Sequence, residues 1–265
     1  MIDKRITLED AAARIQPGQT LALGGMTLYR RPMAFVRALL KHQRTSKESL
    51  DLTLLVFTGA LESDLLVGAG MVKTIRSCYF GLEIFGLAPM FTYHAGRGDL
   101  TILEETELSL ALGLRADISR VGFMPGFAWL GTDLLQLRPD VRTIHDPYSG
   151  EELVAFPASH PQVAVIHTLC ADPEGNALIG DNKAVDIELA MAADLVILTA
   201  EEIVPELARA DIVAPFVDAV VLAPEGAKPT SCHPLYPLDG KSILAYTEQV
   251  SDPATFQLYL ERFLA

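Results

Sequence analysis

Short apolar runs alternate with helical patterns along the whole 265-residue chain, and this alternation restricts the fold more than any other feature. Six runs have the length and aliphatic content of buried strands. They are "TLALGGM" (20–26), "LTLLVFTGA" (52–60), "TIRSCYF" (74–80), "QVAVIHTLCA" (162–171), "DLVILTAEEI" (194–203) and "DAVVLAP" (218–224). Strands that alternate with helices predict an α/β fold, in which an open, mostly parallel sheet carries helices on both faces.

Helical spacing of apolar side chains fills the intervals between these runs. One helix is predicted just after the first run, with Pro32 in its first turn, because a first-turn residue needs no N–H. Further helices are predicted over 63–71 with Ser63 or Asp64 as the cap, over 104–116, from Asp181 to about Ala192, and from Pro253 onward. The segment 137–161 is expected to leave the sheet. We expect residues 1–265 to form a single domain.

Composition and charge exclude several classes of function. Half of the residues are hydrophobic and the formal net charge is −13, so a large core is expected, and binding to nucleic acid or to an anionic membrane surface is not. The opening stretch "MIDKRITLEDAAARIQPG" lacks the apolar region of a signal peptide, and no apolar window predicts a membrane span. The three cysteines are too far apart for a CxxC pair. We therefore expect a cytoplasmic protein.

Familiar cofactor and nucleophile motifs are absent from the sequence. "GAGMVK" (68–73) starts like a dinucleotide fingerprint, but Lys73 replaces the third glycine. "DGKS" (239–242) ends like a P-loop, but Leu235 stands where its first glycine belongs. The sequence has no G-x-S-x-G elbow and no H-E-x-x-H helix, and its six histidines show no ligand spacing. We expect no metal and no permanently bound cofactor.

Glycines and polar residues follow the first three predicted strands, where parallel sheets bind their ligands. Gly24, Gly25, Met26 and Thr27 follow the first strand, Thr58 and Gly59 close the second, and Gly81 and Glu83 follow the third. Two interpretations stay open for the glycine pair. Either it permits close packing or a positive φ, or it makes room for a ligand. Arg30 and Arg31 favour a ligand, because two arginines near a strand end require an anion or an acidic partner.

Three acidic residues, Glu104, Glu105 and Glu107, stand at the start of a predicted helix. Acidic side chains in a first turn are stabilised by the helix dipole, which is a sufficient structural explanation. A carboxylate in a partly desolvated cleft could instead act as a base or a nucleophile. Glu83 has the same two interpretations, as a reactive carboxylate or as a cap or ion-pair partner.

Seven blocks of sequence together resemble the family I coenzyme A transferases, in particular the A (alpha) subunits of the glutaconate CoA-transferase group. The blocks follow the family's order over roughly residues 3–233. They are "GGMTLYRRPMAFVRALL", "VFTGA", "YFGLEIFGLAP", "ALGLRADISRVGFMPGFAWLGTDLL", "HTLCADPEGNA", "DLVILTAEEIV" and "VVLAPEGAKPTSC".

The resemblance implies a CoA-transferase-like fold and a hetero-oligomer in which the partner is a B (beta) subunit. In such enzymes a glutamate attacks the acyl-CoA thioester, which gives a mixed anhydride and CoA thiolate. The thiolate returns to form an enzyme-bound glutamyl-CoA thioester and releases the acyl group as its acid, and a second carboxylic acid then accepts the CoA. That glutamate belongs to a Glu-Asn-Gly motif of the B subunit, and this chain has no such motif; Glu174-Gly175-Asn176 is the nearest string. The resemblance thus implies no catalytic residue in this chain, no activity without the partner, and coenzyme A as substrate.

The substrate-binding wall expected from this chain combines the strand-end residues with a later turn. It comprises Gly24, Gly25, Met26, Thr27, Arg30, Arg31, Thr58, Gly59, Gly81, Glu83, Gly126 and Phe127. In the later turn many relatives carry a Thr-Arg pair where this chain has Gly126 and Phe127, and the missing arginine favours a larger or more apolar acyl group over a dicarboxylate. Relatives often read Gly-Ala-His-Pro where this chain has Gly-Ala-Lys-Pro (226–229), so that Lys228 takes the place of the histidine.

Two alternatives to the transferase stay open. One branch with the same fold opens rings of CoA-linked steroid catabolites by hydrolysis, with a glutamate of the A-type chain in a stretch that resembles "ILEETELSLALGL". Glu104 and Glu107 are then the candidate catalytic residues. The other alternative is a relative that keeps the fold and binds ligands without chemistry.

Overall fold

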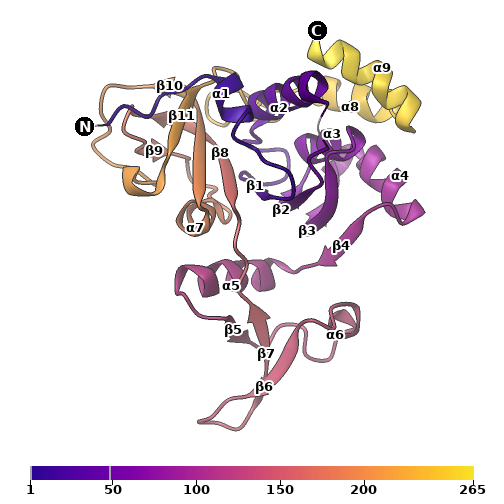
Figure 1. Ribbon diagram of the computed structural model, residues 1–265, viewed down its shortest axis with the longest axis vertical. Helices are drawn as coiled ribbons and strands as arrows, with labels where there is room; N and C mark the ends of the chain where they lie inside the picture. The colour runs from indigo at the N-terminus through magenta and orange to yellow at the C-terminus, as the bar shows by residue number, and fades with distance from the viewer. Residues whose placement is uncertain (1, 48) are drawn as a thin grey trace.

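The computed structural model describes residues 2–47 and 49–265 and shows the expected α/β architecture (Figure 1). Seven strands of the main sheet run parallel in the order β11-β10-β8-β1-β2-β3-β4, and a short β9 pairs with β8 in the antiparallel sense. Their bounds are β1 Thr20–Leu23, β2 Leu52–Gly59, β3 Val72–Phe80, β4 Thr101–Glu104, β8 Val163–Ala171, β9 Ala177–Leu178, β10 Leu195–Ile203 and β11 Ala219–Leu222. The prediction of a mostly parallel sheet is confirmed.

Helices cover both faces of the main sheet, as its apolar strands require. Successive residues of β1 point to opposite faces, so Leu21 and Leu23 enter one core and Ala22 enters the other. The first core is covered by α1 Leu8–Ala12, α2 Met33–Ser46, α3 Leu61–Gly68, α4 Pro89–Arg97, α8 Gly240–Gln249 and α9 Pro253–Leu264. The second is covered by α5 Glu107–Ile118 and α7 Asp186–Ala192.

A second, three-stranded antiparallel sheet projects beyond α5, at the bottom of the view in Figure 1. It has the order β5-β7-β6 and a small core of its own around Trp129 and Phe156. Its strands are β5 Phe123–Gly126, β6 Arg142–His145 and β7 Glu152–Pro157, with α6 Leu134–Leu137 between the first two. The excursion predicted for 137–161 therefore exists but begins earlier, at β5. The single domain over residues 1–265 stays a prediction.

Several helix boundaries differ from the sequence predictions. Helix α3 begins at Leu61 after Ala60, so Ser63 and Asp64 are not its cap, and both lie buried in its first turns. Helix α7 begins at Asp186 and not at Asp181. The segment 104–116 splits into the end of β4 and helix α5, whose N-cap is Thr106. Two short 3₁₀ helices, η1 Glu83–Phe85 and η2 Ala214–Phe216, complete the described elements. No helix in the described ranges is both long and apolar enough to cross a membrane.

Candidate active site at the carboxyl edge of the sheet

The strand order reverses direction between β1 and β8. From β1 the chain builds β2, β3 and β4 on one side, and it later returns to build β8, β10 and β11 on the other. In open α/β sheets such a switch point, at the carboxyl ends of the strands, is the usual place for a ligand. We use the name carboxyl edge for the residues that end or follow β1 to β4, namely 24–31, 58–60, 81–87 and 104–108.

The turn after β1 uses its own backbone amides within the chain. The donors and acceptors are Gly24 N to Val165 O at 2.9 Å, Gly25 N to Asp186 Oδ1 at 2.9 Å, Met26 N to Tyr29 O at 3.0 Å, and Thr27 N to Thr58 Oγ1 at 2.7 Å. None of these four amides is left to bind a phosphate or an oxyanion. Only the half-buried side chains of Met26 and Thr27 face outward from this part of the predicted wall.

The glycine pair is required by close approaches inside the chain. A Cβ on Gly25 would lie 2.6 Å from the carbonyl oxygens of Tyr29 and Arg30, and the backbone φ of Gly25 is +85°. A Cβ on Gly24 would lie 2.9 Å from Asp186 Oδ1. Both glycines are buried. Their function in the fold is to let Asp186 and the returning loop pack against the end of β1.

Arg30 is fully buried and binds acceptors of its own chain. One guanidinium nitrogen donates to Asp186 Oδ2 at 2.8 Å and to Asn182 O at 2.9 Å, and the other donates to His167 O at 2.7 Å. The side chain of Asp186 is buried as well. The crevice at the switch point is therefore filled by a buried ion pair and its hydrogen bonds.

Arg31 is also fully buried, on the β2 side of the turn. It donates to Glu62 Oε1 at 2.5 Å and to Gly25 O at 2.8 Å. A buried charge requires a partner of opposite charge, and both arginines have one inside this chain. Both guanidinium groups are buried and bound within this chain, and the assignment of Arg30 and Arg31 to substrate binding stays a prediction.

Thr58, Gly59 and Gly81 hold the ends of β2 and β3 together. Thr58 binds the turn after β1 through its hydroxyl, and Gly81 N donates to Gly59 O at 3.0 Å. A Cβ on Gly59 would lie 2.5 Å from the Phe80 ring, so this position also serves packing. The three residues are buried, and they shape the carboxyl edge from beneath its surface.

Glu83 is an exposed carboxylate immediately beyond β3. It begins η1 with a φ of +55°, a left-handed conformation that costs a non-glycine residue about 1 kcal/mol or more. The apolar side chains of Ile84 and Leu87 beside it are 92% and 71% exposed. The structure thus presents an exposed acid next to apolar side chains at the place where the sequence predicted a site residue.

The three acidic residues near α5 separate into one buried and two exposed carboxylates. Glu105 is 7% exposed and accepts hydrogen bonds from Arg76, Arg138 and Ser109. Glu104 ends β4 and Glu107 begins α5, and both are exposed. Neither forms an ion pair within the described ranges. Glu105 is therefore held by partners of this chain, whereas the carboxylates of Glu104 and Glu107 are exposed.

The loop after β5 attaches to the same end of the molecule. Trp129 donates its indole N–H to Thr106 Oγ1 at 3.1 Å, and Arg138 donates to Glu104 O at 2.9 Å. Gly126 lies against Leu112 of α5, and Phe127 is 61% exposed. The loop that contains Phe127 is therefore tied through Trp129 and Arg138 to the end of β4 and the start of α5, although it belongs to the smaller sheet.

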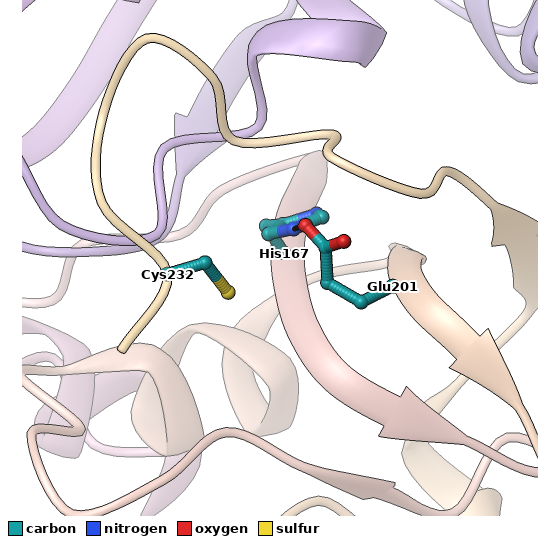
Figure 2. Close-up of side chains that lie close together, drawn as sticks. All are labelled: His167, Glu201 and Cys232. Carbon is teal, nitrogen blue, oxygen red and sulfur yellow. Dashed lines mark hydrogen bonds and ion pairs between the residues drawn. The ribbon is translucent and has the colours of Figure 1, made fainter. Parts of the chain in front are cut away.

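A buried cluster that the sequence did not indicate lies on the other side of the switch point (Figure 2). His167 of β8 contacts Glu201 of β10 through Nε2 at 2.8 Å, and Cys232 reaches toward them from the segment after β11. Glu201 and Cys232 lie 34 and 65 residues after His167 in the sequence, so no local motif could reveal this cluster. His167 also bonds Thr199, its neighbour in the β8–β10 register, at 2.9 Å.

The cluster of His167, Glu201 and Cys232 is a structural hydrogen-bond network rather than a reactive group. Burial lowers the pKa of His167, so the imidazole is neutral, and burial raises the pKa of the Cys232 thiol to about 12. The Glu201 carboxylate also accepts the Tyr236 hydroxyl and two backbone amides of the segment after β11, Glu225 N at 2.6 Å and Gly226 N at 3.1 Å. The thiol is protonated and the carboxylate is saturated with donors, so these groups serve packing.

A cavity of about 450 Å³ opens near the same side of the switch point. Its lining consists of Tyr29, Leu169, Gly180, Asp181, Asn182, His233 and Pro234. The cavity contains none of the predicted site residues. Glu83, Glu104, Glu107 and Phe127 are exposed and do not line this cavity.

The family model described as Coenzyme A transferase matches residues 5–223, which include β1 to β11. The chain belongs to the coenzyme A transferase family. The resemblance noted in the sequence is thereby confirmed.

Relatives in the family differ in the reactions that their names state. The chain is 30% identical to the A subunit of glutaconate CoA-transferase from Acidaminococcus fermentans, over 99% of this chain and 88% of that one. The solved structure of that enzyme matches with a TM-score of 0.90 and 29% identity over 98% and 88% of the two chains. The chain is 32% identical to the cholesterol ring-cleaving hydrolase IpdA subunit of Mycobacterium tuberculosis, over 100% and 94%.

A third reaction is named for a further solved structure. The decarboxylase AibA/AibB matches with a TM-score of 0.87 and 31% identity, over 98% of this chain and 100% of that one. The chain also matches an uncharacterized protein of Archaeoglobus fulgidus at 31% identity and spans 60% of that protein's length. The chain is thus similar to proteins named for transfer, hydrolysis and decarboxylation.

Proposed function

We propose that this chain is the A subunit of a two-subunit CoA-transferase that moves CoA between an acyl-CoA and a carboxylic acid. The observation that carries the proposal is the position of the exposed candidate residues. In a chain of this family, Glu83, Glu104 and Glu107 follow the carboxyl ends of β3 and β4, Phe127 belongs to a loop bound to the same end through Trp129, and all four side chains are exposed. A site that excludes water requires a second wall. Relatives named as A subunits support a partner chain that forms this wall.

In this proposal the chain contributes shape and orientation, and the partner contributes the nucleophile. The amides of Gly24, Gly25, Met26 and Thr27 are bound internally, so these four do not stabilise an oxyanion. The chain also has no Glu-Asn-Gly motif. The attacking glutamate and the oxyanion donors then belong to a B-type partner, and coenzyme A is a substrate rather than a bound cofactor.

The exposed apolar side chains at the carboxyl edge support the same partner. Tyr79, Ile84, Leu87 and Phe127 stand out from the ends of β3 and β5. Grouped apolar side chains are typical of surfaces that another subunit covers. We propose a hetero-oligomer on this basis. The separated cysteines favour a cytoplasmic enzyme.

The test is to co-express the chain with the B-type partner encoded beside it and to assay transfer of CoA from a panel of acyl-CoA esters to acetate. We expect transfer by the complex and none by the chain alone. Transfer by the isolated chain would contradict the shared site. No consumption of any ester, with or without an acceptor, would favour the non-catalytic relative.

A ring-opening hydrolase is the second candidate, and the two free carboxylates next to Glu105 favour it. Glu105 is neutralised by two arginines, whereas Glu104 and Glu107 are exposed and can act as a base. The hydrolase predicts ester consumption without a carboxylic acid acceptor and a loss of about 100-fold or more in kcat in Glu104→Gln or Glu107→Gln. The exposed Glu248→Gln in α8 serves as the control. Full activity in both variants would exclude this candidate.

A further inference from the structure

The arginines in contact with the carboxyl edge are all bound by acids of this chain. Arg30 pairs with Asp186 and Arg31 with Glu62, and these side chains are buried. Arg76 and Arg138 both bind Glu105, at 2.5 Å and 3.1 Å. Arg138 also binds Asp140 at 2.8 Å. No guanidinium of this set is left to receive a carboxylate of a ligand.

The exposed charges at the same edge are negative. Glu83, Glu104 and Glu107 are exposed, and none of them forms an ion pair within the ranges that the structure describes. A ligand that brings a further carboxylate to this edge gains no counter-ion from these four arginines and is repelled by the three glutamates. The electrostatics of the edge therefore disfavour an acyl group with a negative end.

Apolar side chains are also exposed in the first turn of α5 and directly after β5. Leu108 follows Glu107 in the first turn of α5 and is 47% exposed, and Phe127 stands at the end of β5. Phe127 is held in place by the turn that follows it. Trp129 lies two residues on with a φ of +76°, is buried against Phe156, and is bound to Thr106. A bulky residue in this conformation persists only where packing and hydrogen bonds fix it.

We propose that the acyl group this enzyme accepts is apolar and uncharged at its far end, and that Phe127 selects it. The inference rests on the proposed function, since it names the substrate class of that site. The Phe127 ring and Leu108 supply apolar surface for the acyl chain. The acids of the edge, without available arginines, reject an acyl group that ends in a carboxylate.

The first experiment compares two CoA esters of equal acyl length, pentanoyl-CoA and glutaryl-CoA, with the co-expressed two-subunit enzyme. Consumption of ester is followed with acetate as acceptor and without acceptor, so that transfer and hydrolysis are both detected. We expect kcat/KM to favour pentanoyl-CoA by about tenfold or more. A preference for glutaryl-CoA would overturn this inference and leave the proposed function standing. No consumption of any ester would overturn the proposed function, and the inference with it.

The second experiment tests the assignment to Phe127. Phe127→Ala is expected to lower kcat/KM for pentanoyl-CoA by about tenfold, and Phe127→Arg to raise the ratio of glutaryl-CoA to pentanoyl-CoA consumption. Phe216→Ala is the matched control, because Phe216 is a partly exposed aromatic in η2, outside the carboxyl edge. An unchanged ester ratio in both Phe127 variants, with wild-type Tm and normal assembly with the partner, would overturn the role of Phe127.

Discussion

The carboxylate of Asp186 binds the backbone amide of Gly25 through Oδ1 at 2.9 Å and the guanidinium of Arg30 through Oδ2 at 2.8 Å. All three residues are buried, and Asp186 lies in the first turn of α7, far along the chain from the turn that it holds. The glycine turn at the centre of the sheet is therefore fixed from inside the molecule. The charge of Arg30 in this turn is balanced by Asp186 of the same chain, without a ligand.

Asp186→Ala is expected to lower the free energy of unfolding by about 3–5 kcal/mol, because it leaves the Arg30 charge buried without its partner and removes the acceptor of Gly25 N. Urea unfolding followed by circular dichroism measures the change. Asp181→Ala is the control, since Asp181 is exposed and outside this network. A loss below about 1 kcal/mol in Asp186→Ala would contradict the assigned role.

Gly25→Ala is expected to destabilise the chain more than Gly18→Ala, although both glycines have a positive φ. The φ values are +85° and +75°, so the left-handed conformation costs each variant about 1–2 kcal/mol. Only at Gly25 does the added Cβ meet backbone oxygens at 2.6 Å, whereas at Gly18 it meets nothing within 4 Å. The difference in Tm between the two variants isolates the steric part. Equal Tm values would contradict the close approach.

The alternation of strands and helices was readable from the sequence because it depends on local periodicity. The glycine pair after β1 also indicated that another group lies close to the backbone there. The group that makes this approach was not readable, because Asp186 lies 161 residues away and its pairing depends on the tertiary fold. For the same reason the sequence suggested a ligand for Arg30 and Arg31 where the structure has Asp186 and Glu62.

The glutamates near α5 show the same limit of prediction from sequence, within a short stretch of the chain. Local sequence alone gave the three glutamates the same two interpretations, and only the resemblance singled out Glu104 and Glu107. The structural difference of Glu105 comes from Arg76 and Arg138, which lie 29 and 33 residues from it and both bind its carboxylate. Likewise, Ser63 and Asp64 have the residue types of a helix cap, but α3 already begins at Leu61. Both residues therefore lie within the helix, where their side chains are buried.

Glu105→Ala is expected to loosen the smaller sheet from the rest of the molecule. The variant leaves Arg76 and Arg138 without their common acceptor, so we expect a loss of about 3–5 kcal/mol in the free energy of unfolding. Hydrogen exchange should become faster in β5 and β7, which depend on the anchored loop. Glu107→Ala is the matched control, because Glu107 is exposed and makes no ion pair in the described structure. Unchanged exchange in both strands would contradict the anchoring role.

Asp64 is expected to make the stability of the chain depend on pH between about 4 and 6. Its carboxylate is fully buried and accepts the Tyr246 hydroxyl at 2.6 Å and Phe91 N at 2.6 Å. Burial raises the pKa of Asp64 from 3.8 to about 6, despite these bonds, which lower it. The folded chain therefore binds this proton more tightly than the unfolded chain does. The stabilisation is complete below about pH 4 and is lost as the pH rises through about 6.

Urea unfolding of the wild type and of Asp64→Asn at intervals from pH 4 to pH 7 measures this contribution, because asparagine keeps the shape of the side chain and does not titrate. Relative to the variant, the wild type should lose about 1.4 kcal/mol of unfolding free energy per pH unit within the window, and nothing further above it. Parallel curves for the two proteins would show that Asp64 is ionised in the folded chain throughout. The Tyr246 hydroxyl and the amides at the start of α4 would then suffice to hold a buried charge.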